Sequence, residues 1–252
     1  RSLGLGAMGF HSYLQSRSIP FEGIYATGFN YKAFKHIKRH SLRATERLAD
    51  ERGESPDISG SGRRNAHLLA VAPNASSSII CGGTSPSIEP YRANVYTHKT
   101  LSGSFQVKNK YLEEVLQDKG LKKNELTALW KDIAGNEGSV QHLDILTDDE
   151  KELFKTANEI DQIWIIEHAA KRQEFICQAQ SVNLFFILPK ATEPQEVHDD
   201  YMQYVSDVHW YGMNKLKSLY YFRTNAARNA ENVNTKVQRI KLDDAECIAC
   251  EG

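Results

Sequence analysis

Apolar residues recur at helical spacing along much of the chain, and this spacing predicts most of its secondary structure. A first helix is predicted over residues 3–16, with Pro20 helping to end it, and a second over residues 31–52, just before Gly53. The same pattern predicts further helices over residues 110–118, 123–133, 147–179 and 194–216. The stretch 147–179 is long enough to be two helices rather than one.

Three short runs of apolar residues predict strands that are buried on both faces, because they are unbroken where a half-exposed strand would alternate. These runs are residues 67–73, 182–188 and 218–223. Helices separate them along the chain, and this order favours a parallel α/β sheet or part of an α/β barrel. Three strands are few for a closed barrel. A looser alternation over residues 97–109 predicts a hairpin-like excursion.

The composition changes abruptly after Thr224, from mixed apolar and polar residues to a sequence rich in Asn, Ala, Arg, Lys and Asp. A segment with so few apolar residues cannot bury a core of its own. We therefore expect one folded domain over residues 1–224 and a mobile tail over residues 225–252.

The charge balance excludes several classes of partner. The 252 residues include 31 basic and 32 acidic side chains, well mixed along the chain, so we expect neither a nucleic acid polymer nor a membrane surface as partner. No apolar run approaches the length of a membrane helix and the N-terminus does not resemble a signal peptide, which predicts a cytoplasmic protein. Because the chain begins at Arg1 inside an apparent element, we also expect a missing segment upstream.

The glycines at positions 4, 6 and 9 match the spacing of a dinucleotide-binding turn, but their context does not. That turn requires a preceding strand and a helix N-terminus aimed at the pyrophosphate, and no strand precedes Gly4. We interpret these glycines as residues that let a helix pack closely.

Pro73, Asn74, Ala75, Ser76 and Ser77 follow directly after the first predicted strand. Backbone N–H groups and hydroxyls at the carboxyl end of a strand suit an anionic phosphate. Asparagine and serine also cap helices without any ligand, and on pattern alone the capping interpretation is favoured.

Tyr220 and Tyr221 are adjacent in the third predicted strand. Neighbours in a strand point to opposite faces, so one ring is expected in the core and the other at a cleft or an interface. Simple strand propensity explains the pair as well. Stacked tyrosines can also pass an electron together with a proton, because each phenol both donates and accepts a hydrogen bond.

Cys247 and Cys250 form a Cys-x-x-Cys pair near the end of the predicted tail. An accessible pair of this kind can close a disulfide and favours a redox shuttle. A structural zinc site needs four ligands and the sequence has no second pair, so no metal is expected. Cys81 and Cys177 lie in or near apolar segments, and we interpret them as small buried side chains.

Taken in order, these segments resemble the large, catalytic subunit of class I (aerobic) ribonucleoside-diphosphate reductase over nearly the whole chain. Arg64-Asn65, a strand and then Pro73 to Ser77 are similar to its substrate phosphate loop. The order continues through residues 87–96, 101–109, 136–141, 178–183 and 219–224 to the terminal cysteine pair. Any one segment is a weak signal, but the ordered set is specific.

The resemblance implies a fold and a reaction. The fold is the C-terminal part of a ten-stranded α/β barrel, followed by the tail. The reaction is reduction of ribonucleoside diphosphates for DNA synthesis by a radical that arrives from a metal-containing small subunit through a tyrosine pair, here Tyr220 and Tyr221. Cys247 and Cys250 would carry electrons inward and be renewed by thioredoxin or glutaredoxin. No cofactor would be bound by this chain itself.

The same resemblance implies that the chain is inactive alone. The family's radical cysteine, its active-site cysteine pair and its allosteric nucleotide sites lie upstream of the glycine-rich start, so a complementary N-terminal segment must supply them. Such a chain is either a split-gene product or a fragment of a longer one. Cys177 stands where relatives often carry an aspartate. The alternatives are a non-enzymatic module that completes a partner's fold and carries a redox-sensing tail, and a zinc-binding domain that uses the terminal cysteines.

Overall fold

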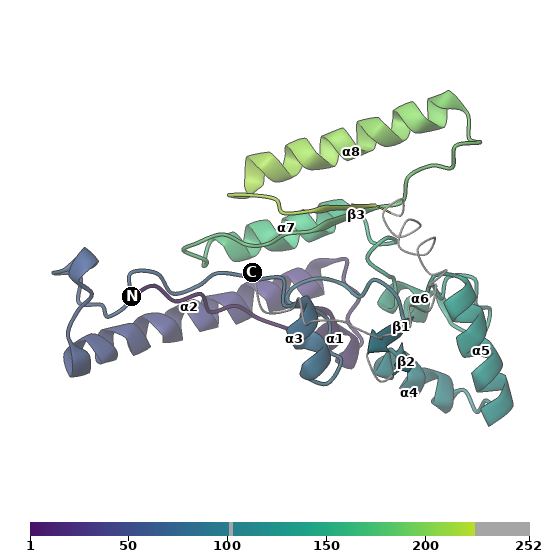
Figure 1. Cartoon of the computed structure of the whole chain (residues 1–252), viewed down its shortest axis with the longest axis horizontal. Coiled ribbons are helices and arrows are strands. Elements are labelled where there is room, and N and C mark those ends of the chain that lie inside the picture. Colours follow the sequence, from purple (N-terminus) through teal and green to yellow (C-terminus); the bar gives the residue numbers. More distant parts are fainter. Residues whose placement is uncertain (101–102, 225–252) are drawn as a thin grey trace, which may run out of the picture.

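The computed structural model describes residues 1–100 and 103–224 (Figure 1). Its strands are β1 Val95–Thr100, β2 Gly103–Lys108, β3 Leu184–Phe186 and β4 Phe222–Thr224. Its helices are α1 Phe10–Ser16, α2 Ile24–Arg52, α3 Ala75–Ile80, α4 Lys110–Asp118, α5 Lys123–Gly135, α6 Asp148–Leu153, α7 Gln162–Gln173 and α8 Gln195–Lys215, with a short 3-10 helix at Pro56–Ile58.

A row of parallel extended segments forms the centre of the fold. Leu5 pairs with Leu69 and Val71 pairs with Gln180, each as an isolated parallel bridge, and β3 pairs with β4 in the same sense. Helices connect these segments along the chain, as in the repeating unit of an α/β barrel. The predicted α/β class is therefore confirmed. We call this row the parallel row, and it consists of residues 3–5, 67–71, 178–186 and 220–224.

The prediction of a helix over residues 3–16 is wrong in its first half. Residues 3–5 are extended and hydrogen-bond to the segment that begins at His67, and α1 begins only at Phe10. Glycine is a poor helix former, and here it permits close approach: a Cβ on Gly6 would lie 2.8 Å from the Ala70 carbonyl oxygen. The glycines thus let two strands approach, rather than a helix.

Other elements also begin or end at residues that differ from the predicted ones. Helix α2 begins at Ile24 rather than Tyr31, and the predicted strands shrink to two bridges near Leu69, to β3 and to β4. The long pattern over residues 147–179 divides into α6 and α7. The hairpin is confirmed, since β1 and β2 pair in antiparallel register with Val95 opposite Lys108.

The described residues divide into two packed regions, and their buried apolar residues form three clusters, two in the first region and one in the second. In the first, α7 lies between α2 and α8 and also contacts β3, so that Ile166, Leu184 and Val208 from three elements meet in one buried cluster (Figure 1). We call residues 1–92 and 156–224 the sheet region. The second, the helical appendage of residues 93–155, contains β1, β2, α4, α5 and α6, and it buries Leu116 and Trp130 in a core of its own.

A buried polar network joins the two regions. Within the sheet region, His11 accepts the backbone N–H of Tyr91 on Nδ1 at 3.0 Å, and its Nε2 lies 3.3 Å from the amide nitrogen of Gln15, which reaches the appendage. Gln15 donates to the carbonyl oxygen of Leu153 at 3.2 Å and accepts from the Asn109 side chain at 2.9 Å. Burial lowers the pKa of His11 to about 3, so the imidazole in this joint is neutral.

Candidate functional site

Tyr220 and Tyr221 lie together at the start of β4. Their ring centroids are 4.1 Å apart at an interplanar angle of 45°, and each side chain is 48% exposed. A hydrogen bond with the Tyr221 phenol raises the pKa of Tyr220. The two hydroxyl groups are thus close enough to interact directly, as transfer of a proton between them requires.

The expectation that the two rings point to opposite faces is wrong. Tyr220 and Tyr221 precede the regular strand, which begins at Phe222, so strict alternation of side chains does not apply to them. Both rings are half-exposed, and neither belongs to the core.

The backbone around the pair is fixed by the parallel row. Tyr220 N–H donates to the Val182 carbonyl oxygen at 2.9 Å, and Leu184 N–H donates to the Tyr221 carbonyl oxygen at 2.9 Å. The guanidinium of Arg223 lies 4.7 Å from the centre of the Tyr221 ring, a cation–π distance. The two rings are half-exposed, but the backbone that carries them is held by hydrogen bonds to Val182 and Leu184.

Two polar residues, Asn183 and Glu89, lie next to the backbone of the tyrosine pair. Both belong to segments that carry the family resemblance, but the sequence pattern predicts no role for either. Asn183 accepts the Tyr221 N–H on Oδ1 at 3.2 Å, and its amide nitrogen donates to Glu89. Both side chains are buried. The only available signal was a carboxylate placed between Ile88 and Pro90, which does not by itself reveal burial.

The predicted phosphate loop follows the strand segment that ends near Val71. Asn74 adopts a left-handed conformation with φ of +50° and starts α3, but its side chain makes no capping hydrogen bond. The capping interpretation therefore fails at Asn74. Ala75, Ser76 and Ser77 are exposed, while Pro73 and Asn74 are partly buried. The exposed serine hydroxyls are free to meet a ligand.

The predicted loop and the tyrosines adjoin the same extended segment, residues 178–186, from its two sides. Val71 pairs with Gln180 through an isolated bridge, and the predicted loop begins two residues after Val71, at Pro73. Tyr220 hydrogen-bonds to Val182 from the other side. The two predicted site elements thus follow, or belong to, segments that pair with the same central segment of the parallel row.

The cysteines divide into two groups. Cys247 and Cys250 lie outside the described residues. The interpretation of Cys81 as buried is wrong, since it is exposed, and Cys177 is partly buried. At Cys177 burial raises the pKa of the thiol, but the backbone N–H groups of Leu68 and Leu69 donate to its sulfur and the net pKa is lowered.

Within residues 1–100 and 103–224, no group of three or more His, Cys, Asp or Glu side chains has a metal-binding arrangement. Across the same residues, none of the helices combines the length and the apolar character that crossing a membrane requires.

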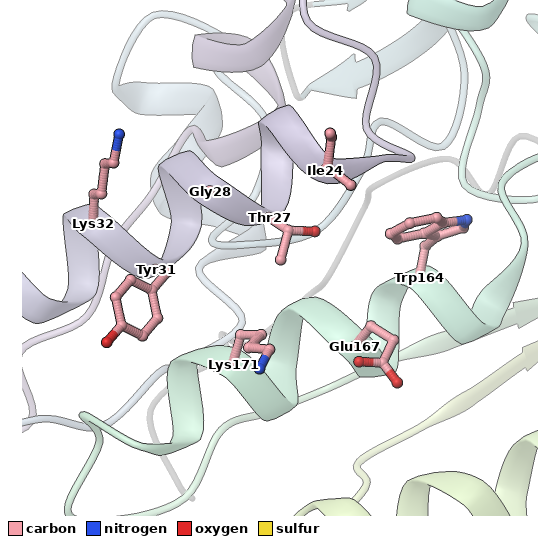
Figure 2. A pocket seen from close by; sticks show the side chains of 8 residues that line it. All are labelled: Ile24, Thr27, Gly28, Tyr31, Lys32, Trp164, Glu167 and Lys171. Carbon is pink, nitrogen blue, oxygen red and sulfur yellow. The ribbon is translucent and has the colours of Figure 1, made fainter.

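A groove between α2 and α7 is separate from these elements (Figure 2). Its volume is about 560 Å³, and none of the predicted site residues lines it. Its lining residues are Ile24, Thr27, Gly28, Tyr31, Lys32, Trp164, Glu167 and Lys171.

Parallel extended segments connected by helices, as in this row, define part of an α/β barrel. The family model described as "Ribonucleotide reductase, barrel domain" matches residues 1–61 and 55–222. The chain belongs to this ribonucleotide reductase family, which confirms the resemblance seen in the sequence.

Individual relatives agree. The chain is 43% identical over its full length to the ribonucleoside-diphosphate reductase large subunit of Invertebrate iridescent virus 3, and 42% identical over 93% of its length to that of Invertebrate iridescent virus 6. The solved alpha subunit of the class Id ribonucleotide reductase from Actinobacillus ureae is 41% identical, with a TM-score of 0.74 over 89% of this chain. The chain spans 39% and 24% of the two viral relatives and 39% of the solved chain.

Proposed function

We propose that the chain forms the C-terminal part of a ribonucleoside-diphosphate reductase large subunit and supplies the last steps of its radical pathway. The observation that carries the proposal is the direct contact of the Tyr220 and Tyr221 rings in a chain of this family. The reaction is the cytoplasmic reduction of ribonucleoside diphosphates to deoxyribonucleoside diphosphates for DNA synthesis.

The tyrosine pair acts as a relay for an electron and a proton. When a tyrosyl radical forms on one phenol, it takes one electron and one proton from its neighbour, and the neighbour is left as the radical. The partial exposure of both rings suits this role, because the radical enters from a separate metal-containing small subunit and leaves toward a cysteine on another segment.

Pro73, Asn74, Ala75, Ser76 and Ser77 bind the phosphates of the substrate. The exposed hydroxyls and the backbone N–H groups at the start of α3 support this assignment, and so does the place of the loop after a segment that pairs, like the tyrosine segment, with residues 178–186. In the same proposal Cys247 and Cys250 deliver electrons to the active site and are renewed by thioredoxin or glutaredoxin.

A complementary N-terminal segment supplies the radical cysteine. The edge of the parallel row supports this part of the proposal, because Leu3 and Leu5 are 52% and 50% exposed although they lie in an extended segment. An apolar strand edge left open in this way is suited to pairing with another strand.

The test combines the chain with the complementary segment and the small subunit and measures deoxynucleotide formation. Tyr220→Phe and Tyr221→Phe keep the ring and remove the phenolic O–H, so each should abolish turnover and leave nucleotide binding unchanged. Tyr25→Phe is the matched control, because Tyr25 is 78% exposed at the start of α2 and lies outside the pair.

Full turnover in both variants of the pair would refute the relay. It would favour instead the non-enzymatic module that only completes a partner's fold, since such a module tolerates loss of the hydroxyls.

A further inference from the structure

Glu89 is a buried carboxylate with a defined hydrogen-bond partner. Its side chain is only 6% exposed, and it accepts a hydrogen bond from the amide nitrogen of Asn183, which is 2% exposed. Burying a carboxylate is costly unless hydrogen bonds and opposite charges compensate. A carboxylate at this place therefore needs a reason beyond filling space.

The turn that carries Glu89 is rigid. Ser87 adopts a left-handed conformation with φ of +47°, the Glu89 N–H donates to the Pro86 carbonyl oxygen at 2.9 Å, and Pro90 follows directly. Proline fixes the backbone at its own position and restricts the residue before it. Glu89 is thus presented to Asn183 from a well-defined backbone.

Asn183 connects this turn to the tyrosine pair. One end of its side-chain amide donates to Glu89, and the other end accepts the N–H of Tyr221 at 3.2 Å. An amide held at both ends cannot rotate without losing one of the two bonds. The orientation of Asn183, and with it the position of the Tyr221 backbone, therefore depends on Glu89.

From this geometry we infer that Glu89 is a positioning residue for the radical relay, which acts through Asn183 to hold Tyr221 in contact with Tyr220. The inference rests on the proposed function and extends it to a residue that touches neither ring. Arg223 contacts the same tyrosine on its ring, since its guanidinium lies over the Tyr221 ring. Asn183, held by Glu89, contacts the Tyr221 backbone.

The role depends on the hydrogen bond rather than on a permanent charge. Burial raises the pKa of Glu89 to about 7, against the opposing effects of Arg92, the Asn183 hydrogen bond and Arg223. The side chain is therefore partly protonated near neutral pH. A glutamine at this position keeps the oxygen that accepts from Asn183, whereas an alanine removes it.

The experiment measures turnover of the assembled enzyme with Glu89→Ala, Glu89→Gln and Asn183→Ser. Glu89→Ala should lower kcat about tenfold to a hundredfold, the range that follows from a small misplacement of a reacting group, with KM for the nucleotide unchanged. Glu89→Gln should restore most of the rate. Asn183→Ser removes the same bridge, so combining it with Glu89→Ala should be no slower than either alone.

The matched control is Glu159→Ala, which removes another carboxylate whose partners are Ser139 and Thr156, away from the tyrosines. The inference is overturned if Glu89→Ala turns over like the control, or if the Glu89→Ala and Asn183→Ser effects multiply. Should Glu89→Ala fail to assemble, Asn183→Ser carries the test, and a wild-type kcat in that variant overturns the inference.

Tyr221→Phe separates the positioning role of Glu89 from the relay itself. If Tyr221→Phe is inactive and Glu89→Ala is normal, only the positioning role fails. An active Tyr221→Phe refutes the relay.

Discussion

The helical appendage and the sheet region solve the same folding problem in different ways. The appendage closes around its own core, where Leu112, Leu116 and Ile133 are completely buried. The sheet region also has a well-packed core, with Leu14, Ile166 and Leu184 completely buried, but its parallel row has an apolar edge at Leu3 and Leu5. The appendage buries a core within itself, whereas the sheet region leaves the apolar edge of its parallel row exposed.

The candidate site follows this division. The predicted phosphate loop, the tyrosine pair and the Glu89–Asn183 bridge all lie in the sheet region, beside segments of the parallel row. The predicted site residues within the described part of the chain all lie outside the appendage. The appendage buries a core of its own, whereas the predicted site elements lie in the region whose parallel row has an exposed apolar edge.

The largest expected effect comes from cavities in the two cores. Leu116→Ala and Leu184→Ala each remove a completely buried side chain, so each should lower the free energy of unfolding by about 2–5 kcal/mol in denaturant titrations. Leu184 lies in β3 beside β4, so only Leu184→Ala should also lower the turnover of the assembled enzyme. An equal loss of turnover in both variants would show that the two regions work as one unit.

A smaller effect is expected at the edge of the parallel row. Gly6→Ala places a Cβ 2.8 Å from the Ala70 carbonyl oxygen, so it should lower the free energy of unfolding by about 1–3 kcal/mol and weaken association with the complementary segment. Gly135→Ala is the control, because no atom lies within 4 Å of the added Cβ. It should raise the free energy by about 0.5 kcal/mol. Unchanged association in Gly6→Ala would mean that this edge is not a joining surface.

At neutral pH the smallest effect is expected at the joint between the two regions, because this effect develops only as the pH falls below 6.5. The pKa of His11 is about 3 in the folded chain and 6.5 in a model peptide, so the unfolded chain binds the extra proton between these values. Stability due to neutral His11 is fully present above pH 6.5 and falls as the pH drops toward 3, by at most about 1.4 kcal/mol per pH unit.

His11→Gln should therefore give a curve of unfolding free energy against pH that is shallower than that of the wild type below pH 6.5. His168, whose pKa burial lowers to about 4, contributes to the acid sensitivity that remains. Burial raises the pKa values of Glu150 and Glu167, but hydrogen bonds with Lys119 and Lys215 lower them overall, so these two carboxylates contribute as well. Parallel curves for the variant and the wild type would contradict the assignment.

The sequence predicted elements well where local pattern decides them. The spacing of apolar residues located α4, α5 and α8, and the alternation over residues 97–109 located the hairpin. The prediction of a helix is wrong at residues 3–5, because these residues pair with a segment more than sixty positions away. Such pairing overrides the local preference, and the spacing of apolar residues does not indicate the partner.

The candidate site shows the same limit. The tyrosines and the loop were found through the order of family segments, but the contact between the two rings depends on a backbone that leaves the regular strand at Tyr221. Glu89 and Asn183 are 94 positions apart, and neither shows in the sequence that the other is its partner. Long-range polar pairs of this kind become visible only when the fold is known.

The parallel row has one further consequence, for how the chain behaves without the proposed N-terminal segment. The row has the segment at Leu5 at one edge and β4 at the other. The two segments run in the same direction, and they present different surfaces. If copies of the chain meet edge to edge, the first segment of one adds to the last segment of the next, and a contact of this head-to-tail kind does not close on itself. Synthesis of the chain without a capping strand should therefore yield growing filaments or aggregates rather than a defined dimer.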